Sequence, residues 1–384
     1  MRTSLKVAAV LAVAAFFSFA SWNRADAGYP APAGNPKPAG SFGSSGYKVL
    51  APISHGNLTI FPVVAATTYD TGRFLTLDEG LRTGEVVITE WSNVRGMVRP
   101  RHGRRCPPNA DCYTPPTRSA QVNSLALINN SDRPLLLLAG EIVTGGKQDR
   151  VIGKDRIVPP NSEPLDLNVF CVEPGRWTGA TEQFGTVSKL APMAQPAVRS
   201  KAMADKDQQK VWDAVGSSNS AVAGALSPSA RAEVAGRTSY AGVMANEEVK
   251  KQVDTVAAPM QKSYESVLPQ LRAQRAVGVV VAVNGEIIWA DLFASTSLLE
   301  KYWPKLVRSY AAEAVTARRA RWGTPSVAEA QQFLEDLDGR RQSVETEPGV
   351  FRHTEIWGKG FRAFELASLL PKTGFDVHIS KMAE

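Results

Sequence analysis

A glycine pair followed by polar side chains is the first place in this sequence that suggests chemistry. In "LLLLAGEIVTGGKQDRVI" (residues 135–152), an apolar run ends in Gly-Gly and continues with Lys147, Gln148, Asp149 and Arg150. A P-loop needs Gly, four residues and then Gly-Lys-Ser/Thr, because its amides wrap phosphates and its hydroxyl holds magnesium. Here Glu141 stands at the first glycine position and Gln148 replaces the hydroxyl. We therefore expect a glycine-supported turn that exposes Lys147, Gln148 and Arg150, either simply solvated or able to bind an anion.

A second polar turn follows a strand-like run. The segment "FCVEPGRW" (residues 170–177) places Glu173, Arg176 and Trp177 around a Pro-Gly turn. Glu173 and Arg176 can pair with each other, or they can line a cleft in which the Trp177 ring offers a flat stacking face. The candidate ligand-binding residues are Lys147, Gln148, Arg150, Glu173, Arg176 and Trp177. They form one site only if the two turns fold side by side.

Patterns for catalysis and metal binding are missing from the sequence. There is no Gly-x-Ser-x-Gly, and none of the four histidines forms His-x-x-x-His or His-Glu-x-x-His. Cys171 lies in an apolar context, which favours a buried small hydrophobe over a nucleophile. We therefore assign no catalytic residue, no metal ligand and no cofactor.

An arginine-rich loop at residues 95–118 is the most basic segment. Its arginines are Arg95, Arg99, Arg101, Arg104, Arg105 and Arg118. The loop is either solvated or grips a polyanion such as phospholipid headgroups or acidic glycans. Nucleic acid is not expected, because Tyr113 is its only aromatic residue. Cys106 and Cys112 are expected to form a disulfide that contributes about 2 kcal/mol.

The N-terminus has the pattern of a secretory signal peptide, residues 1–27. Two basic residues precede the apolar run 7–20, which is shorter than the roughly 20 residues of a membrane span, and Ala25-Asp26-Ala27 fits a cleavage site. Residues 28–46 read as a disordered linker, because 12 of the 19 are Gly, Pro or Ser. We expect an exported protein, periplasmic or extracellular, with no transmembrane segment after signal removal. Cleavage lowers the net charge from +7 to +5, too little to indicate nucleic acid.

The patterns of apolar residues and turn formers along the chain predict an α+β fold in one domain, residues 47–381. Residues 47–177 are β-rich, with short β-branched runs between turn formers, and residues 178–381 are mixed. Asn284-Gly285 between two apolar runs predicts a β-hairpin. Helices are expected at 206–215, 228–235, 246–272, 298–315 and 326–338. We expect Pro259 and Pro269 to interrupt or end the third helix, and Pro304 to begin or kink the fourth.

Three blocks resemble a bacterial family of unknown function, the ARG and rhodanese-phosphatase-superfamily-associated protein domain. They are the 135–152 stretch, "LNVFCVEPGRW", and "NGEIIWADLFASTSLLEKYWPKLVRSYAAEA". The resemblance covers residues 48–369, and the arginine-rich loop looks like an insertion peculiar to this chain. It implies genomic association with ADP-ribosylglycohydrolase-like and phosphatase-like proteins, but no activity and no catalytic residues.

Three functions remain open from the sequence. The first is a ligand- or partner-binding domain without catalysis, whose partner is unknown but can be an anionic small molecule or an envelope component. The second is an enzyme or accessory acting on a phosphorylated or ADP-ribosyl-like compound. The third is binding to anionic envelope surfaces through the arginine-rich loop.

Overall fold

The computed structural model describes residues 46–95, 97, 119–179, 181–186, 192–317, 323–335 and 339–384, which belong to one compact unit. The predicted signal peptide and nearly all of the linker lie outside the described residues. So do Cys106, Cys112 and every arginine of the arginine-rich loop except Arg95. The predictions made for those segments therefore stay predictions.

The largest sheet joins the two ends of the described chain. Its order is β1-β3-β13-β14-β18-β17-β16-β15, with β2 beside β3, and all its pairs are antiparallel. The strands are β1 (Tyr47–Val49), β2 (Ile53–His55), β3 (Leu58–Ala65), β13 (Ala276–Val283), β14 (Glu286–Phe293), β15 (Gly339–Glu347), β16 (Phe351–Gly358), β17 (Phe361–Ser368) and β18 (Asp376–Ala383). Strands from the first and last thirds of the sequence therefore lie side by side.

Two smaller sheets are built from the β-rich part of the chain. One has the order β12-β8-β9-β11-β6-β5 and the other β10-β7-β4. Their strands are β4 (Leu75–Thr76), β5 (Val86–Thr89), β6 (Ser124–Asn129), β7 (Leu135–Leu137), β8 (Ile142–Gly145), β9 (Arg150–Ile152), β10 (Arg156–Val158), β11 (Leu165–Cys171) and β12 (Phe184–Gly185). The core of these sheets is aliphatic, with Leu127, Leu137 and Val169 fully or almost fully buried.

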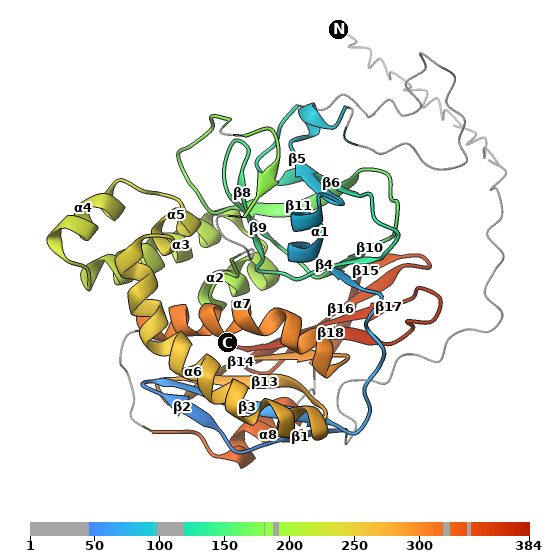
Figure 1. Cartoon of the computed structure of the whole chain (residues 1–384), viewed down its shortest axis with the longest axis vertical. Helices are drawn as coiled ribbons and strands as arrows, with labels where there is room; N and C mark the ends of the chain where they lie inside the picture. Colours follow the sequence, from blue (N-terminus) through green and yellow to red (C-terminus); the bar gives the residue numbers. More distant parts are fainter. Residues whose placement is uncertain are drawn as a thin grey trace, which may run out of the picture. The chain divides into compact units, whose positions relative to one another are not determined.

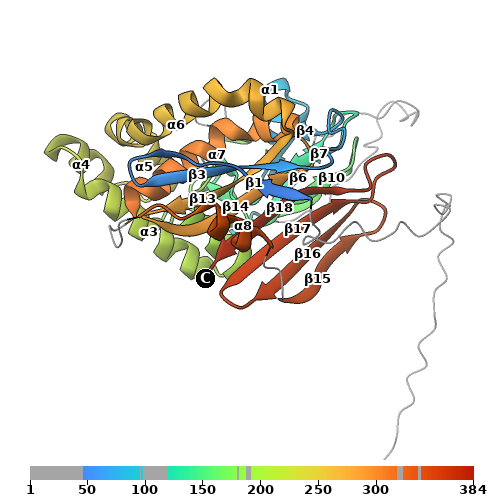
Figure 2. The same ribbon diagram turned by 90° about the horizontal axis from the view of Figure 1, so that it is seen from below.

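The described chain also forms helices and helical turns. They are α1 (Leu77–Thr83), the 3-10 turn η1 (Trp91–Asn93), α2 (Pro196–Ser200), the π-helical turn η2 (Lys201–Asp205), α3 (Gln208–Gly224), α4 (Pro228–Ala235), α5 (Tyr240–Met244), α6 (Glu247–Ala273), α7 (Thr296–Thr316) and α8 (Val327–Glu335). Figure 2 shows α6 and α7 on one side of the large sheet and α8 on the other. The α7 side holds the main core, which includes Tyr302, Trp303 and Tyr310.

The predicted hairpin is confirmed at its turn. Asn284 and Gly285 both have positive φ, +54° and +81°, as a two-residue turn of the right twist requires. Strands β13 and β14 flank it and pair antiparallel. The α+β class is likewise confirmed by the sheets and helices of Figure 1.

The expectation that proline would interrupt the long helix is wrong. Helix α6 continues through Pro259 and Pro269, and α7 continues through Pro304. Each proline removes an amide donor, but the carbonyls that lose it in α6 belong to Thr255 and Glu265, which are exposed to water. The buried face of α6, from Val249 to Leu271, holds the helix together past both prolines.

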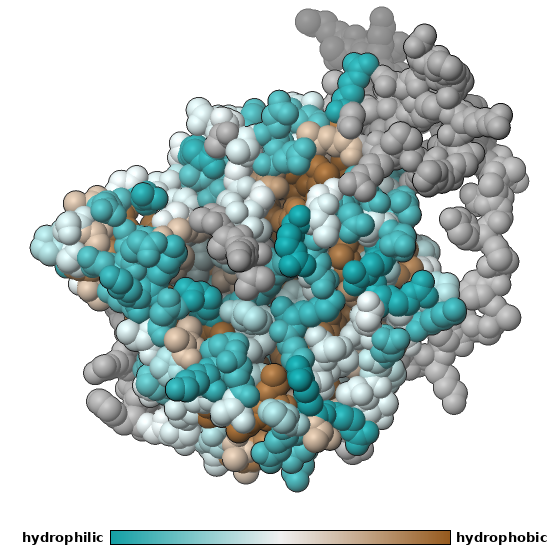
Figure 3. All heavy atoms as spheres, in the orientation of Figure 1, coloured by the Kyte–Doolittle hydropathy of each residue, from teal (hydrophilic) through white to brown (hydrophobic). Residues whose placement is uncertain are grey.

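The face of the molecule in Figure 3 is largely hydrophilic, with hydrophobic residues visible in smaller areas between polar ones. Within the described ranges, no helix is both long and apolar enough to cross a bilayer.

Candidate ligand-binding cleft

The glycine-supported turn joins two short buried strands. Strands β8 and β9 pair antiparallel, with Val143 opposite Arg150, and Gly145 and Gly146 both have positive φ. A side chain on Gly146 would collide with the ring of Phe184, because a Cβ there would lie 2.2 Å from it. The two glycines therefore serve the turn and its close packing.

The amides of this turn are already occupied. Gly145 N–H donates to Asp149 Oδ1 (3.0 Å), Gly146 N–H to Thr181 Oγ1 (3.1 Å) and Lys147 N–H to Glu90 Oε1 (3.2 Å). A phosphate-binding loop needs such amides free to face the ligand. The geometry therefore agrees with the two mismatched positions in the sequence: this is not a P-loop.

The second polar turn lies directly against the first. Asp149 N–H donates to Glu173 Oε2 (3.0 Å), and Arg176 donates to the carbonyl of Gly146 (3.1 Å). Arg176 Nη2 also lies 2.6 Å from Glu173 Oε2 and 3.6 Å from Asp149 Oδ1. The structure thus brings the 145–150 and 173–177 segments together, as a shared site requires.

The predicted ligand-binding residues differ in their access to solvent. Trp177 is 42% exposed, and Lys147 Nζ lies 5.0 Å from the centre of its ring. Gln148 and Arg150 are 5% and 0% exposed, so the expectation that the turn exposes them is wrong. Arg150 faces inward because it lies in β9, opposite Cys171 of β11, and its Nε–H donates to the carbonyl of Val122 (2.7 Å).

Near the Gly-Gly turn, three buried polar atoms have no hydrogen-bond partner among the described residues. They are Glu90 Oε2, Gln148 Oε1 and Arg150 Nη2. Arg150 Nη2 lies 4.0 Å from Glu90 Oε1, too far for a hydrogen bond. Unpartnered buried polar atoms are costly, so a polar atom of a ligand or an ordered water would be stabilised here. Glu90 was not found from the sequence, because it lies 55 residues before Gly145 and no motif spacing links the two positions.

A third segment completes a polar cleft of about 560 Å³. It is the loop between α4 and α5, from which Ser239 Oγ–H donates to Asp149 Oδ2 (2.6 Å). The lining residues are Asp149, Glu173, Pro174, Gly175, Arg176, Gly236, Arg237, Thr238, Ser239 and Gly242. The formal charges of its two carboxylates and its two guanidinium groups cancel.

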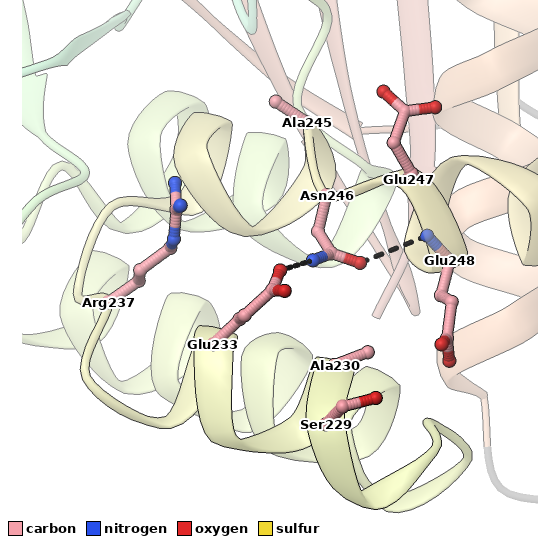
Figure 4. Close-up of a pocket in the computed structure, with 8 residues that line it drawn as sticks. All are labelled: Ser229, Ala230, Glu233, Arg237, Ala245, Asn246, Glu247 and Glu248. Carbon is pink, nitrogen blue, oxygen red and sulfur yellow. Dashed lines mark hydrogen bonds between the residues drawn. The ribbon is translucent and has the colours of Figure 1, made fainter.

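Arg237 is the exposed cation of the cleft. Its guanidinium makes no hydrogen bond or ion pair with any described residue. It also lines a second pocket of about 350 Å³, shown in Figure 4, together with Glu233, Glu247 and Glu248. In that pocket Asn246 Nδ2–H donates to Glu233 Oε2 (2.9 Å). Arg237 therefore stands between two pockets with its charge available.

Burial perturbs the ionisable groups around the cleft. It raises the pKa of Asp149, although hydrogen bonds from Ser239 and Gly145 act in the opposite direction. The hydrogen bond to Glu173 raises the pKa of Arg176. Burial also raises the pKa of the Cys171 thiol, which is fully buried, as expected for a small hydrophobic residue. A neutral, inaccessible thiol is a poor nucleophile.

A buried ionic cluster, which we call the His378 cluster, was missed by sequence reasoning. Its members are Asp155, Arg199, Asp291, Tyr310 and His378, all fully buried. His378 Nδ1 lies 2.5 Å from Asp155 Oδ2, and its Nε2 lies 3.2 Å from Asp291 Oδ1. Arg199 and the hydroxyl of Tyr310 both donate to Asp291.

The side chains of the His378 cluster have no contact with solvent. No substrate reaches a histidine with 0% exposure without rearrangement, so the cluster is a structural element of this conformation. A comparable buried contact joins Lys305 to Glu141 (2.6 Å) and to Asp78. The one sequence signal was a charged residue within an apolar run, as for Asp291 in "EIIWADLF".

No three His, Cys, Asp or Glu side chains in the described part of the chain are arranged to hold a metal ion.

Fold and cleft together define an α+β domain with a polar cleft beside a Gly-Gly turn. Residues 46–381 match the family model of the ARG and Rhodanese-Phosphatase-superfamily-associated Protein domain, and the chain belongs to this family. No curated protein and no solved structure matches the chain.

Proposed function

We propose that this protein is a ligand-binding domain that does not itself catalyse a reaction. The observation that carries the proposal is the convergence of three segments, distant in sequence, on one polar cleft. Asp149, Glu173 and Ser239 are tied to one another through hydrogen bonds of Asp149. Such a pre-formed cleft with a few fixed polar groups is typical of small-molecule sites.

The charges of the cleft describe the ligand. Arg237 offers a guanidinium group that no described residue pairs with, which favours an anionic group on the ligand. Asp149 and Glu173 favour hydrogen-bond donors such as hydroxyl or amino groups next to it. The exposed ring of Trp177, which follows Arg176 in the chain, does not line the cleft; it lies against Lys147 and offers a stacking face outside it. The proposed ligand is therefore a polar small molecule that carries both an anionic group and donors.

A thermal-shift screen of the purified protein tests this proposal. Nucleotides, ADP-ribose and anionic glycans are the panel, and a true ligand raises the Tm with concentration. In the Arg237→Ala variant we expect the affinity to fall about tenfold, because one charged hydrogen-bonding group is lost. Arg82→Ala, on the exposed side of α1, is the matched control and should bind normally. A panel without any stabilising compound, or an unchanged Arg237→Ala response, contradicts the proposal.

Catalysis on a phosphorylated or ADP-ribosyl-like compound is the second candidate. The observation that favours it is the raised pKa of Asp149, 2.6 Å from the Ser239 hydroxyl, because acids and bases with perturbed pKa values concentrate at active sites. Product analysis after incubation with ADP-ribose conjugates and phosphorylated compounds is the test. Turnover that disappears in Asp149→Asn while binding persists would replace the first proposal with this one.

Binding of anionic envelope surfaces through the arginine-rich loop is the third candidate, and it rests on sequence alone. It predicts salt-sensitive binding to anionic vesicles or glycans that is lost when residues 95–118 are deleted. Binding that survives this deletion rules the loop out.

We also propose that the protein is exported after cleavage before Gly28. The basic, apolar and small-residue regions of residues 1–27 support this proposal. N-terminal sequencing of the protein recovered from the producing cells should begin at Gly28. A chain that retains residues 1–27 and stays in the cytoplasmic fraction contradicts export.

A further inference from the structure

A further cavity among the described residues is separate from the cleft. It is a groove of about 1110 Å³ where α2, α3 and the end of α7 meet. The three helices lie close together in Figure 1. Its lining residues are Gln195, Ala197, Trp212, Asp213, Ala214, Gly216, Ser217, Ser218, Ser220, Ala221, Glu313, Val315, Thr316 and Ala317. Asp213, Gly216, Ser217 and Ser220 are exposed, so the groove is open to solvent.

The floor of the groove is a closed hydrogen-bond network. Ser218 Oγ–H donates to Gln195 Oε1 (2.7 Å), and Gln195 Nε2–H donates to Thr316 Oγ1 (2.8 Å). Gln195 and Ser218 are 2% and 3% exposed. These contacts fix the side chains at the base of the groove, so its shape is set before any ligand arrives.

Among the described residues, the groove carries negative charge without a matching cation. Glu313 accepts a hydrogen bond from Ala197 N–H (2.9 Å) and pairs with no cation of the described chain. Burial raises the pKa of its carboxyl group. Asp213 adds a second carboxylate, and none of the described lining residues is Lys, Arg or His. A positive group placed here would compensate a charge that is costly as it stands.

Two further features favour a cation over a neutral ligand. The groove lies at the C-terminal end of the 21-residue helix α7, where the helix dipole places partial negative charge. The ring of Trp212 forms part of the wall, and an indole is the best aromatic partner for an ammonium or guanidinium group. The carboxylate of Glu313, the C-terminal end of α7 and the indole of Trp212 therefore all favour a positively charged ligand.

We propose that this groove binds an organic cation, a primary ammonium or guanidinium group carried on an aliphatic chain. Glu313 is its ion-pairing partner and Trp212 its stacking partner, while the small residues Gly216, Ser217 and Ala221 of α3 leave room for the chain. The source of the cation is either a free polyamine or an arginine side chain of a peptide. This site is independent of the cleft at Asp149.

Calorimetric titration of the full chain at low ionic strength tests the groove with two probes. Spermidine represents free polyamines, and a capped Ala-Arg-Ala peptide represents a basic peptide. Binding of either probe supports the site, and the stronger of the two identifies the source. Raising the salt concentration should weaken the binding. If neither probe binds, the proposal is overturned.

A pair of carboxylate variants shows whether binding occurs at Glu313. Glu313→Gln keeps an oxygen to accept the Ala197 amide but removes the charge, so affinity should fall about tenfold or more. Glu265→Gln removes an exposed charge from α6, away from the groove, and should bind like the wild type. Equal binding by Glu313→Gln and wild type overturns the assignment.

A third variant tests the groove even if Glu313→Gln does not fold. Ser217→Lys introduces an ammonium group at the exposed edge of the groove and leaves Glu313 untouched. The new lysine should compete with the probe and abolish binding, while the Tm without probe stays close to that of the wild type. A folded Ser217→Lys protein that binds the probe at full strength contradicts the groove as the site.

Discussion

Arg199 and Asp291 form a two-pronged ion pair in which neither side chain has any exposed surface. Nη1 lies 3.0 Å from Oδ2 and Nη2 lies 3.1 Å from Oδ1, and the guanidinium also stacks on the ring of Trp289. The pair ties α2 to β14 of the large sheet. The charge of Arg199, which links α2 to the large sheet, is thus neutralised by one strand residue, Asp291.

Breaking this pair should destabilise the protein strongly. Arg199→Met leaves the Asp291 carboxylate without its main partner in the interior, which should lower the free energy of unfolding by about 3–5 kcal/mol. The exposed pair Arg272–Glu300, which is also bidentate, is the matched control, and Arg272→Met should destabilise the protein far less, because water screens an exposed ion pair. Urea unfolding measures both. Similar losses in the two variants would show that burial does not determine the effect.

The two buried histidines should produce a stability optimum near pH 6.5. Burial alone would lower the pKa of His378, but Asp155 and Asp291 outweigh it and raise the pKa to about 9. Its stabilising contribution is therefore complete below 6.5 and is lost as the pH rises toward 9. Burial lowers the pKa of His353 to about 4, so stability also falls as the pH decreases from 6.5 toward 4.

The measurement is the free energy of unfolding between pH 4 and pH 9 for wild type and two single variants. His378→Gln should flatten the alkaline side of the curve, and His353→Gln should flatten the acidic side. Lys154, Lys206, Glu355 and Asp155 also face His353, so they are left unchanged in all proteins. An unaltered slope in either variant contradicts the assignment for that histidine.

Gly140 should tolerate no side chain. Its φ is +95°, and a Cβ would lie 2.5 Å from Arg199 Cγ, so alanine would both strain the backbone and displace the buried guanidinium. We expect Gly140→Ala to cost about 3 kcal/mol or more. Gly56 has φ +60° with open space around it, so Gly56→Ala measures the backbone cost alone, about 1 kcal/mol. Comparable losses for the two would exclude a steric effect at Arg199.

Alkylation of the denatured protein should count one free thiol before reduction and three after it. Cys171 is a free buried cysteine, and the other two are expected to be joined. Mass spectrometry of the alkylated, unreduced protein reads the number directly. Three modified cysteines without reduction would contradict the Cys106–Cys112 disulfide.

Local features of this fold could be predicted from sequence because their causes are local. The Asn284-Gly285 turn fixes where β13 ends and β14 begins, and Asn246 caps α6 as expected by accepting from the amides of Glu248 and Val249. The sequence shows that a shared site requires the 145–150 and 173–177 turns to be adjacent, but it does not show whether they are. Strand pairing decides it, since β9 and β11 lie side by side.

The His378 cluster could not be predicted because no local pattern connects its members. Asp155 precedes β10, Arg199 lies in α2, and Asp291 and His378 come from neighbouring strands of the large sheet. Apart from Asp291, which stands in an apolar run, each ionisable member taken alone looks like a surface residue. Only the pairing of β14 with β18, which places Asp291 and His378 on one face, turns isolated charges into a cluster.

The order of strands in the large sheet also constrains how the chain can fold. Strand β3 pairs with β13, about two hundred residues later, and β13 is joined to the last strand of the chain only through β14. Strand β3 must therefore wait, with an unpaired edge, until about three quarters of the polypeptide has been synthesised. Premature termination before residue 276 would leave β3 without its central neighbour, and such fragments should aggregate or be degraded.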